Sequence, residues 1–415
     1  MDAAGAYRYM GSMVGTALVD DATGFLDGVV SSRRKLHARP ELGLVLPETK
    51  RAVIEALAGL PIELWESERS SGLVATLRGA QPGPTLLLRA DMDALKMPED
   101  TGLSFASSNP GTMHACGHDA HTAMLVGAVR LLATRRDALH GSVKFLFQPG
   151  EEGHFGARIM IEEGILDAEP KVDAAFAIHV APLAPRGTVL TRRGPIMAAV
   201  DNFSVTLTGR GGHASMPDRC IDPVPATAEL VQALQAMVTR RVPVSDAGVL
   251  TVTRLEAGTT TNVIPERAQI AGTIRSLSER TRTILHDGLR RVSEGVAAAH
   301  ELAAEVSIGQ GYPVVVNHAA FTDFTSEVAR DLFGPDGVVE MTAPVMGAED
   351  FSYVVQRVPG TFVFFGVRPD GVARPQDLHS NRMVLDEGTM ARGVALHAAM
   401  ALRYLDGTTR TFAAP

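Results

Sequence analysis

The sequence LLLRADMD (residues 86–93) is a run of apolar residues that ends in acids. It predicts a buried strand with two carboxylates at its carboxyl end. SVKFLFQPGEE (142–152) and DAAFAIHV (173–180) predict two more buried strands, which end in glutamates and in a histidine. Between the first two strands, HTAMLVGAVRLLATRR (121–136) places its apolar residues on one face at helical spacing. Strands that alternate with helices predict an α/β fold with a mainly parallel sheet covered by helices.

The pattern changes near residue 200. Phe203, Val205 and Leu207 alternate with polar residues, which is typical of a strand with one solvated face. A helix, two strands, a second helix and a last strand are predicted to follow, and the order βαββαβ is that of a ferredoxin-like domain. We therefore expect a larger domain in two parts, 22–197 and 313–415, interrupted by an inserted domain over 198–312.

Composition narrows the classes of partner. The 415 residues include 39 Lys and Arg against 47 Asp and Glu, a formal net charge of −8, so the protein lacks the basic surface that nucleic acid requires. No stretch predicts a membrane span, and residues 1–21 lack the features of a secretory signal and are expected to form a tail. Only Cys116 and Cys220 occur, which argues against a disulfide framework and suits the cytoplasm.

Four segments place cysteine, histidine and glutamate at the carboxyl ends of predicted strands or in the loops that follow, where open α/β sheets bind ligands. They are MHACGHD (113–119), QPGEEG (148–153), IHV (178–180) and LHS (378–380). Thiolate, imidazole and carboxylate together suit Zn²⁺ or Mn²⁺. One glutamate of the pair can bind such an ion while its neighbour acts as a base toward a water that the ion activates.

Each segment taken alone also has a purely structural interpretation. Cys116 and His118 would point apart on a helix, so they can converge only from a turn or extended segment, which Gly117 permits. A lone cysteine is often a core residue. The pair Glu151 and Glu152 would fit a solvated helix N-terminus. The four segments together favour a metal site.

The sequence resembles the aminoacylase and carboxypeptidase-G-like dinuclear metallopeptidase family, in the branch of hippurate hydrolases, N-acyl-amino-acid amidohydrolases and auxin-conjugate hydrolases. The resemblance extends from Arg33 to the C-terminus and rests on motifs in the family's order: RADMDAL, NPGTMHACGHDAHTAMLVGA, FQPGEEG, GRGGHASMP, TTTNVIPE, GTIRS, MGAEDFSY and DLHS. It implies that the larger domain is a zinc-exopeptidase-like catalytic domain. The insertion would be a lid and dimerisation domain, which implies a homodimer or higher homo-oligomer.

The resemblance also implies roles for residues of the larger domain. Cys116 would bridge two divalent ions, Mn²⁺ or Zn²⁺ first and Co²⁺ or Ni²⁺ as further candidates, with the coordination completed by His118, Glu152, His179 and His379. Glu151 would be the general base that takes a proton from the water between the metals and delivers it to the leaving amine. Asp93 would support a ligand imidazole, whereas Asp91 fits that role or that of an ordinary acid at a strand end.

In the inserted domain, the resemblance implies that His213 donates to the developing oxyanion. The histidine would act either in its own subunit's site or, across a dimer, in the partner's. Asn262 and Arg275 would hold the substrate's carboxylate or an adjacent oxygen. Without the resemblance, an asparagine turn and a surface arginine on a strand explain these two residues equally well.

Three positions depart from the family pattern. Gly150 stands where Ala is usual, His154 and Phe155 replace a glycine-rich stretch, and Lys96 stands where Pro is common. None of these changes removes an implied ligand. All fall near the expected substrate cleft, so they concern selectivity rather than chemistry.

We therefore expect a metal-dependent amidohydrolase that cleaves small N-acyl amino acids, such as hippurate-like, N-acetyl or aryl-acyl conjugates. A metallo-dipeptidase or carboxypeptidase of the same family is the nearest alternative. A cysteine-nucleophile hydrolase built on Cys116 with His114, His118 or His121 would leave the paired glutamates and remote histidines without a role. A metal-loaded, non-catalytic binding protein would give Glu151 no use.

Overall fold

The computed structural model describes residues 17–408 and 410–414, which form two compact units. The first unit contains the described residues up to Gly194, Val316–Thr342 and the described residues from Tyr353 onward. The second contains Pro195–Val315 and Ala343–Ser352. The sequence pattern did not indicate that Ala343–Ser352 groups with the insertion rather than with the larger domain. Among the described residues, no helix has the length and apolar character needed to cross a membrane.

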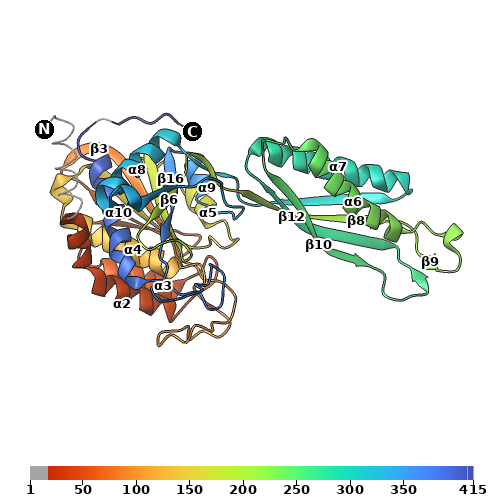
Figure 1. Ribbon diagram of the computed structural model, residues 1–415, viewed down its shortest axis with the longest axis horizontal. Coiled ribbons are helices and arrows are strands. Elements are labelled where there is room, and N and C mark those ends of the chain that lie inside the picture. The colour runs from red at the N-terminus through yellow and green to blue at the C-terminus, as the bar shows by residue number, and fades with distance from the viewer. Residues whose placement is uncertain (1–16, 409, 415) are drawn as a thin grey trace. The chain divides into compact units, whose positions relative to one another are not determined.

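The first unit is built on an eight-stranded sheet of order β1-β2-β4-β3-β5-β16-β6-β15 (Figure 1). Its strands are β1 (Glu63–Glu66), β2 (Leu73–Arg78), β3 (Gln81–Asp91), β4 (His140–Gln148), β5 (Ala174–Ala181), β6 (Val189–Thr191), β15 (Val338–Glu340) and β16 (Gly360–Gly366). The central pairs β4/β3, β3/β5 and β5/β16 are parallel, as the alternation of strands and helices predicted. The pairs β1/β2, β2/β4 and β16/β6 are antiparallel, so the sheet is mixed toward its edges. β7 (Gly194–Met197) and β14 (Val315–Asn317) form a separate two-stranded sheet.

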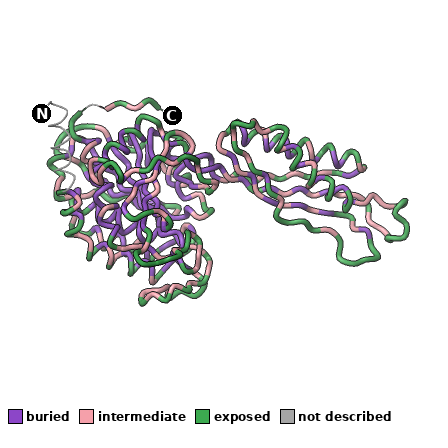
Figure 2. The backbone as a smooth tube through the Cα atoms, viewed as in Figure 1, coloured by how far each residue is buried: buried purple, intermediate pink, exposed green. Residues whose placement is uncertain are grey.

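Helices pack around this sheet and bury its apolar side chains. Figure 2 shows the buried residues concentrated in the interior of the first unit. The helices are α2 (Leu26–His37), α3 (Pro47–Leu57), α4 (His118–Ala133), α5 (Gly156–Glu162), α8 (Ala319–Phe333), α9 (Ser352–Val355) and α10 (Met390–Tyr404), with short 3-10 turns η1 (Arg136–Ala138), η3 (Pro335–Gly337) and η4 (Glu387–Thr389). α4 contacts both α2 and α10 as well as the sheet, so it is buried nearly all round. That burial explains why its sequence is apolar on more than the one predicted face.

The predicted tail is shorter than the sequence suggested. Residues 17–23 are helical, and Leu18 and Ala22 are buried in the core of the first unit. The prediction of a tail is therefore wrong for residues 17–21, because Leu18 in this segment is buried in the core. The rest of the expected tail lies outside the described residues.

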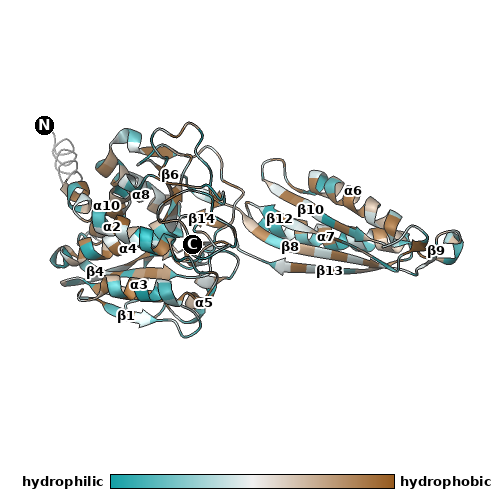
Figure 3. Cartoon of the chain, turned by 90° about the horizontal axis from the view of Figure 1, so that it is seen from below, coloured by the Kyte–Doolittle hydropathy of each residue, from teal (hydrophilic) through white to brown (hydrophobic). Residues whose placement is uncertain are grey.

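The second unit has the predicted ferredoxin-like topology. β8 (Ala199–Thr208), α6 (Pro223–Arg241), β10 (Gly248–Ala257), β12 (Arg267–Ser276), α7 (Glu279–Ala299) and β13 (Ala303–Gln310) follow one another as βαββαβ, with short elements β9 (Gly212–His213), η2 (Pro217–Arg219) and β11 (Val263–Ile264). The four long strands form an antiparallel sheet of order β10-β12-β8-β13. α6 and α7 bury their apolar residues against it. Figure 3 shows apolar and polar residues alternating along α6. Phe203, Val205 and Leu207 point into this core, which confirms the alternation.

Candidate metal centre

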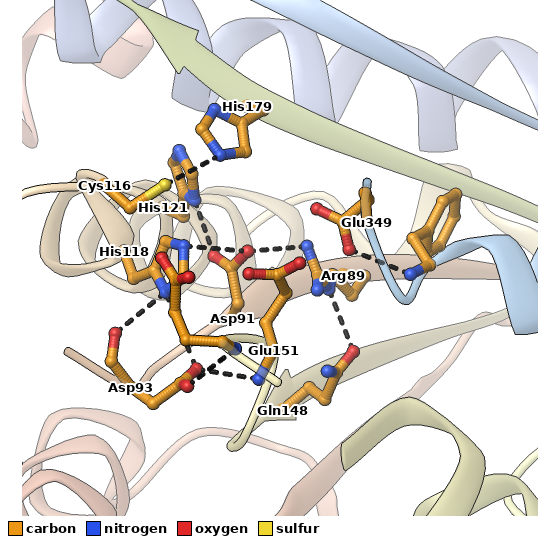
Figure 4. A network of polar contacts seen from close by, with 12 residues as sticks. Arg89, Asp91, Asp93, Cys116, His118, His121, Gln148, Glu151, His179 and Glu349 are labelled. Atoms are coloured by element: carbon orange, nitrogen blue, oxygen red, sulfur yellow. Dashed lines mark hydrogen bonds and ion pairs between the residues drawn. The ribbon is translucent and has the colours of Figure 1, made fainter. Parts of the chain in front are cut away.

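The candidate ligands of the first unit lie at one edge of its sheet. β4, β3 and β5 are parallel neighbours, so their carboxyl ends meet at the same edge. β5 carries His179, Glu151 and Glu152 follow β4, and α4 begins at His118. His379 comes from the loop between β16 and η4. Segments far apart in sequence therefore bring their chemically active side chains to one place (Figure 4).

The turn before α4 presents Cys116 and His118 to the same point. Gly117 has φ +82°, a left-handed conformation that favours glycine. A Cβ on this residue would lie 2.4 Å from Cγ2 of Val180, so no side chain fits. Cys116 precedes the helix and His118 is its first residue. Gly117 thus provides the non-helical backbone that the sequence predicted.

Cys116, His118 and His179 form the first group of candidate ligands, with donor atoms within 4.8 Å of one another. Nδ1 of His118 lies 2.8 Å from the carbonyl oxygen of Asp93, and Nδ1 of His179 lies 2.8 Å from that of Val180. A carbonyl oxygen only accepts, so each Nδ1 carries a proton, and in the neutral ring that binds a metal each Nε2 keeps its lone pair. Nε2 of His179 lies 3.4 Å from Cys116 Sγ. Both imidazoles therefore direct a metal-binding nitrogen to the same region as the sulfur.

Cys116, Glu152 and His379 form a second group with the same spacing. Nε2 of His379 lies 3.3 Å from Glu152 Oε1, and the histidine has φ +63°, an uncommon backbone conformation for a non-glycine residue. Hydrogen bonds with Cys116 and Glu152 raise the pKa of His379 to about 10, because two acidic neighbours favour its charged form. The two groups share Cys116.

Asp93 holds the backbone around the paired glutamates. Its Oδ1 accepts a hydrogen bond from the amide of Glu151 and its Oδ2 from the amide of Glu152, both at 3.0 Å. The expected support of an imidazole is supplied by the main-chain carbonyl of Asp93, which accepts from His118. Glu151 is buried in a turn after β4, so the alternative of a solvated helix N-terminus is wrong.

The site combines buried acids with histidines and one arginine. Arg89 Nη1 lies 2.7 Å from Asp91 Oδ2, and Arg89 Nε donates to Gln148 Oε1 at 3.0 Å. Burial disfavours the charged form of Asp91, but Arg89 and two nearby imidazoles hold the pKa of this carboxyl well below its usual value. Asp91, left open by the sequence, is thus part of the polar network and not an ordinary strand-end acid.

These residues fit a divalent cation. Burial raises the pKa of the Cys116 thiol, and a bound cation is what would stabilise its thiolate form. Nε2 of His118 is buried without a hydrogen-bond partner, and a cation would satisfy its lone pair. Thiolate, imidazole and carboxylate donors are the mixed set that zinc-like ions accept.

The second unit brings together two of its three predicted site residues. His213 in β9 pairs with Val263 in β11, and the carbonyl of the adjacent Asn262 accepts from Ala214 N at 3.1 Å. Both side chains are exposed. Arg275 lies elsewhere: it is half-buried in β12 and donates to the carbonyl of Met346 at 3.0 Å.

Arg275 and the pair of His213 and Asn262 lie at opposite ends of the second unit's sheet. β12 runs from Arg267, opposite Thr208, to Arg275, opposite Val200. The chain reaches β9 and β11 from the Thr208 and Arg267 end. At about 3.3 Å per strand residue, the eight steps from Arg267 to Arg275 span roughly 26 Å. A small substrate cannot contact both ends within one chain.

A buried ionic network behind the Cys116 turn was not predicted. His37 Nδ1 lies 2.8 Å from Asp119 Oδ2, its Nε2 lies 3.1 Å from Glu99 Oε1, and Arg33 Nε donates to the same Asp119 oxygen. Burial opposes the charged imidazole, but Asp119 and Glu99 overcome this effect and raise the pKa of His37 to about 9. The sequence indicated this network only through two motifs that lie far apart in the chain. RRKLHARPELG (33–43) contains Arg33 and His37, and HACGHD (114–119) contains Asp119.

Two of the three departures from the family pattern are linked by packing. Gly150 has φ +72°, and a Cβ there would lie 2.6 Å from Leu44 Cδ2 and 3.1 Å from His154 Cβ. Leu44 and His154 therefore leave little room for a side chain at position 150, where this chain has glycine. Phe155, with φ +60°, stacks against the Arg158 guanidinium at 4.3 Å. Nothing in the structure explains Lys96.

The fold and the ligand groups together define a metal-dependent hydrolase with a ferredoxin-like insertion. Over residues 87–403 the chain matches Peptidase family M20/M25/M40, and it belongs to this family. It is accordingly a metal-dependent amidohydrolase, and neither the thiol-hydrolase alternative nor the non-catalytic one is supported.

Several relatives are similar along nearly the whole chain. A thermostable carboxypeptidase of Saccharolobus solfataricus is 38% identical over 93% of this chain and 98% of its own length. An N-acetylcysteine deacetylase of Bacillus subtilis is 37% identical over 91% and 97%. An IAA-amino acid hydrolase of Arabidopsis thaliana is 37% identical over 92% and 86%. The crystal structure of a dinuclear metal-binding peptidase of the M20 family from Bacillus subtilis has a TM-score of 0.82 and 34% identity, covering 93% and 99% of the two chains.

Gly150→Ala should destabilise the turn that carries the glutamates more than Gly153→Ala does. Both glycines have positive φ, so each substitution costs about 1 kcal/mol of backbone strain. A Cβ at Gly153 meets nothing within 4 Å, whereas one at Gly150 overlaps Leu44, which adds about 1–3 kcal/mol. Urea unfolding and turnover of the two variants measure the difference. Equal losses in both would contradict the crowding at Gly150.

The charge on His37 predicts a pH-dependent contribution to stability. Because its pKa is raised to about 9 in the folded protein, the contribution is complete below the unfolded value of about 6.5 and is lost as pH rises through 9. The stability advantage of the wild type over His37→Gln should therefore shrink between those pH values. Urea unfolding at several pH values and fixed metal concentration gives this difference. A constant advantage from pH 6 to 9.5 would show that folding does not raise the pKa of His37.

Proposed function

We propose that this protein hydrolyses the amide bond of small N-acyl amino acids with two divalent ions, both of which Cys116 would help to hold. The observation that carries the proposal is the pair of ligand groups that share this sulfur. His118 and His179 would complete one site, and Glu152 and His379 the other. Zn²⁺ and Mn²⁺ fit these donors best, with Co²⁺ and Ni²⁺ as further candidates.

When bound, the ions would polarise the amide carbonyl and make water nucleophilic near neutral pH. Of the two neighbouring glutamates, Glu151 is the one that belongs to neither of the ligand groups that contain Cys116. Its amide is fixed by Asp93 beside that of Glu152, so the base and the ligand are held on the same turn. Glu151 would take the proton from the attacking water and deliver it to the leaving amine.

The second unit would recognise and activate the substrate. His213 would donate to the oxyanion, and Asn262 and Arg275 would hold the carboxylate end. Since Arg275 and the other two lie at opposite ends of the sheet, their joint action on one substrate requires two copies of the chain. We therefore propose a homodimer, or a higher homo-oligomer, in which His213 and Asn262 serve the partner's site.

A carboxypeptidase or dipeptidase is the second candidate, favoured by the 38% identical relative that carries a carboxypeptidase name. A dipeptidase requires a free α-amine on its substrate, whereas an acylase requires an acylated one. A panel of hippurate, N-acetyl, fatty-acyl and indoleacetyl amino acids, together with free dipeptides, separates the two on metal-reconstituted protein. The free thiols of Cys116 and Cys220 support a reducing compartment such as the cytoplasm.

Glu151→Gln should keep both metals and lose roughly 10²- to 10⁴-fold in turnover, because it removes a proton carrier and leaves the ligands intact. Glu152→Gln should lose metal, because an amide is a poorer ligand than a carboxylate. Metal content and rate must be measured on the same samples. Full activity of Glu151→Gln, or full occupancy of Glu152→Gln, would refute the respective role.

Two inactive variants should rescue each other if sites are shared between subunits. In a dimer of Glu151→Gln with His213→Ala, one site combines an intact base with the partner's intact histidine. At equal mixing about half the dimers are mixed and half of their sites are intact, so activity should approach roughly a quarter of wild type. Mixing Glu151→Gln with Glu152→Gln is the control, because every site then keeps a defect. Confirmed subunit exchange without recovery would assign His213 to its own subunit or exclude it from catalysis.

A further inference from the structure

His121 is a buried histidine on α4, one turn after His118, with an exposed fraction of 1%. Its Nδ1 lies 2.5 Å from Asp91 Oδ1, and its Nε2 accepts a hydrogen bond from the amide of Val180 at 2.9 Å. Figure 4 shows its ring between the candidate ligands His118 and His179. The proposed mechanism gives it no role.

The two contacts fix the state of the ring. The amide of Val180 can only donate, so Nε2 of His121 must accept with its lone pair. The proton of a neutral ring is then on Nδ1 and is donated to Asp91. Neither nitrogen has a lone pair left for a metal ion. His121 is therefore not a ligand, although it lies within reach of Asp91 and His118.

The surroundings of His121 lead to both imidazoles of the first ligand group. The His121 ring lies against that of His118, with centroids 5.4 Å apart. Val180, whose amide donates to His121, accepts through its carbonyl from Nδ1 of His179. The His121 ring also lies against that of His179, with centroids 4.6 Å apart. One side chain thus braces both imidazoles of the first ligand group.

We propose that His121 is a positioning residue that sets the geometry of the metal site formed by Cys116, His118 and His179. The inference rests on the proposed function and names a determinant of one of its two sites. Within the described part of the chain, His121 makes no hydrogen bond, ion pair or ring contact with Glu152 or His379, so the other site should not depend on it.

An effect on only one of the two metal sites would distinguish a positioning role of His121 from a general role in folding. A destabilised first unit would weaken both metal sites together. Loss of a brace on two imidazoles should instead weaken one site by roughly 10- to 100-fold, the usual cost of losing a residue that orients metal ligands. The prediction is a split between the two metal dissociation constants.

The experiment compares His121→Leu with His397→Leu in the full-length protein. His397 is also a buried histidine with 1% exposure, on α10, but its ring lies against Phe176 and its Nδ1 has no hydrogen-bond partner. Both substitutions therefore remove a buried imidazole, and only one removes contacts to ligand supports. Zn²⁺ occupancy is measured by mass spectrometry after equilibration in graded Zn²⁺ buffers.

In His121→Leu, one of the two dissociation constants should rise and the other stay near the wild-type value. His397→Leu should change neither. His121→Gln, which keeps one donor and one acceptor, should lie between wild type and His121→Leu, and it serves as the test if His121→Leu fails to fold. Unchanged affinities in the His121 variants, or equal weakening of both sites, would overturn the positioning role. A wild type that binds fewer than two ions would instead refute the proposed dinuclear site.

Discussion

Asp93 connects three segments on which the candidate metal centre depends. It lies just beyond the end of β3, its carbonyl fixes the imidazole of His118 at the start of α4, and its carboxylate fixes the amides of Glu151 and Glu152 after β4. Two strands and a helix thereby meet around one residue. A carboxylate that accepts two amide hydrogen bonds leaves the turn little freedom, so the paired glutamates keep distinct positions although they are neighbours in sequence. The proposed division of roles, with Glu152 as ligand and Glu151 as base, depends on these fixed positions.

Much of the fold could be predicted because its elements are encoded by local patterns. The alternation of Phe203, Val205 and Leu207 identified β8, and the apolar runs identified β3, β4 and β5. Candidate ligands could be named because cysteine, histidine and glutamate followed those strands in motifs of a known order. The helix over residues 17–23 was missed because its two buried residues, Leu18 and Ala22, form too short a pattern to be distinguished from a tail.

The supporting contacts could not be predicted, because they join residues that no local pattern relates. His37 meets Asp119 across 82 positions, and His121 meets Val180 across 59. Gly150 was noticed only as a departure from a pattern. Its reason became visible once Leu44 and His154 were found against it. Motifs thus identify the groups that carry chemistry, whereas the packing that orients those groups requires the folded chain.

In the proposed mechanism the first unit binds the metal ions and the second unit acts on the substrate. Measurements of metal content and of catalytic rate can therefore distinguish their contributions. The five residues proposed as ligands, and the supporting residues Asp93 and His121, belong to the first unit, whose buried sheet and helices form their own core. His213, Asn262 and Arg275 belong to the second unit, which has a separate core. Groups that act only on the substrate need not contribute to the affinity for the ions. Losing one of them should therefore appear in the kinetics and leave the metal content unchanged, whereas losing a brace such as His121 should appear first in the metal content.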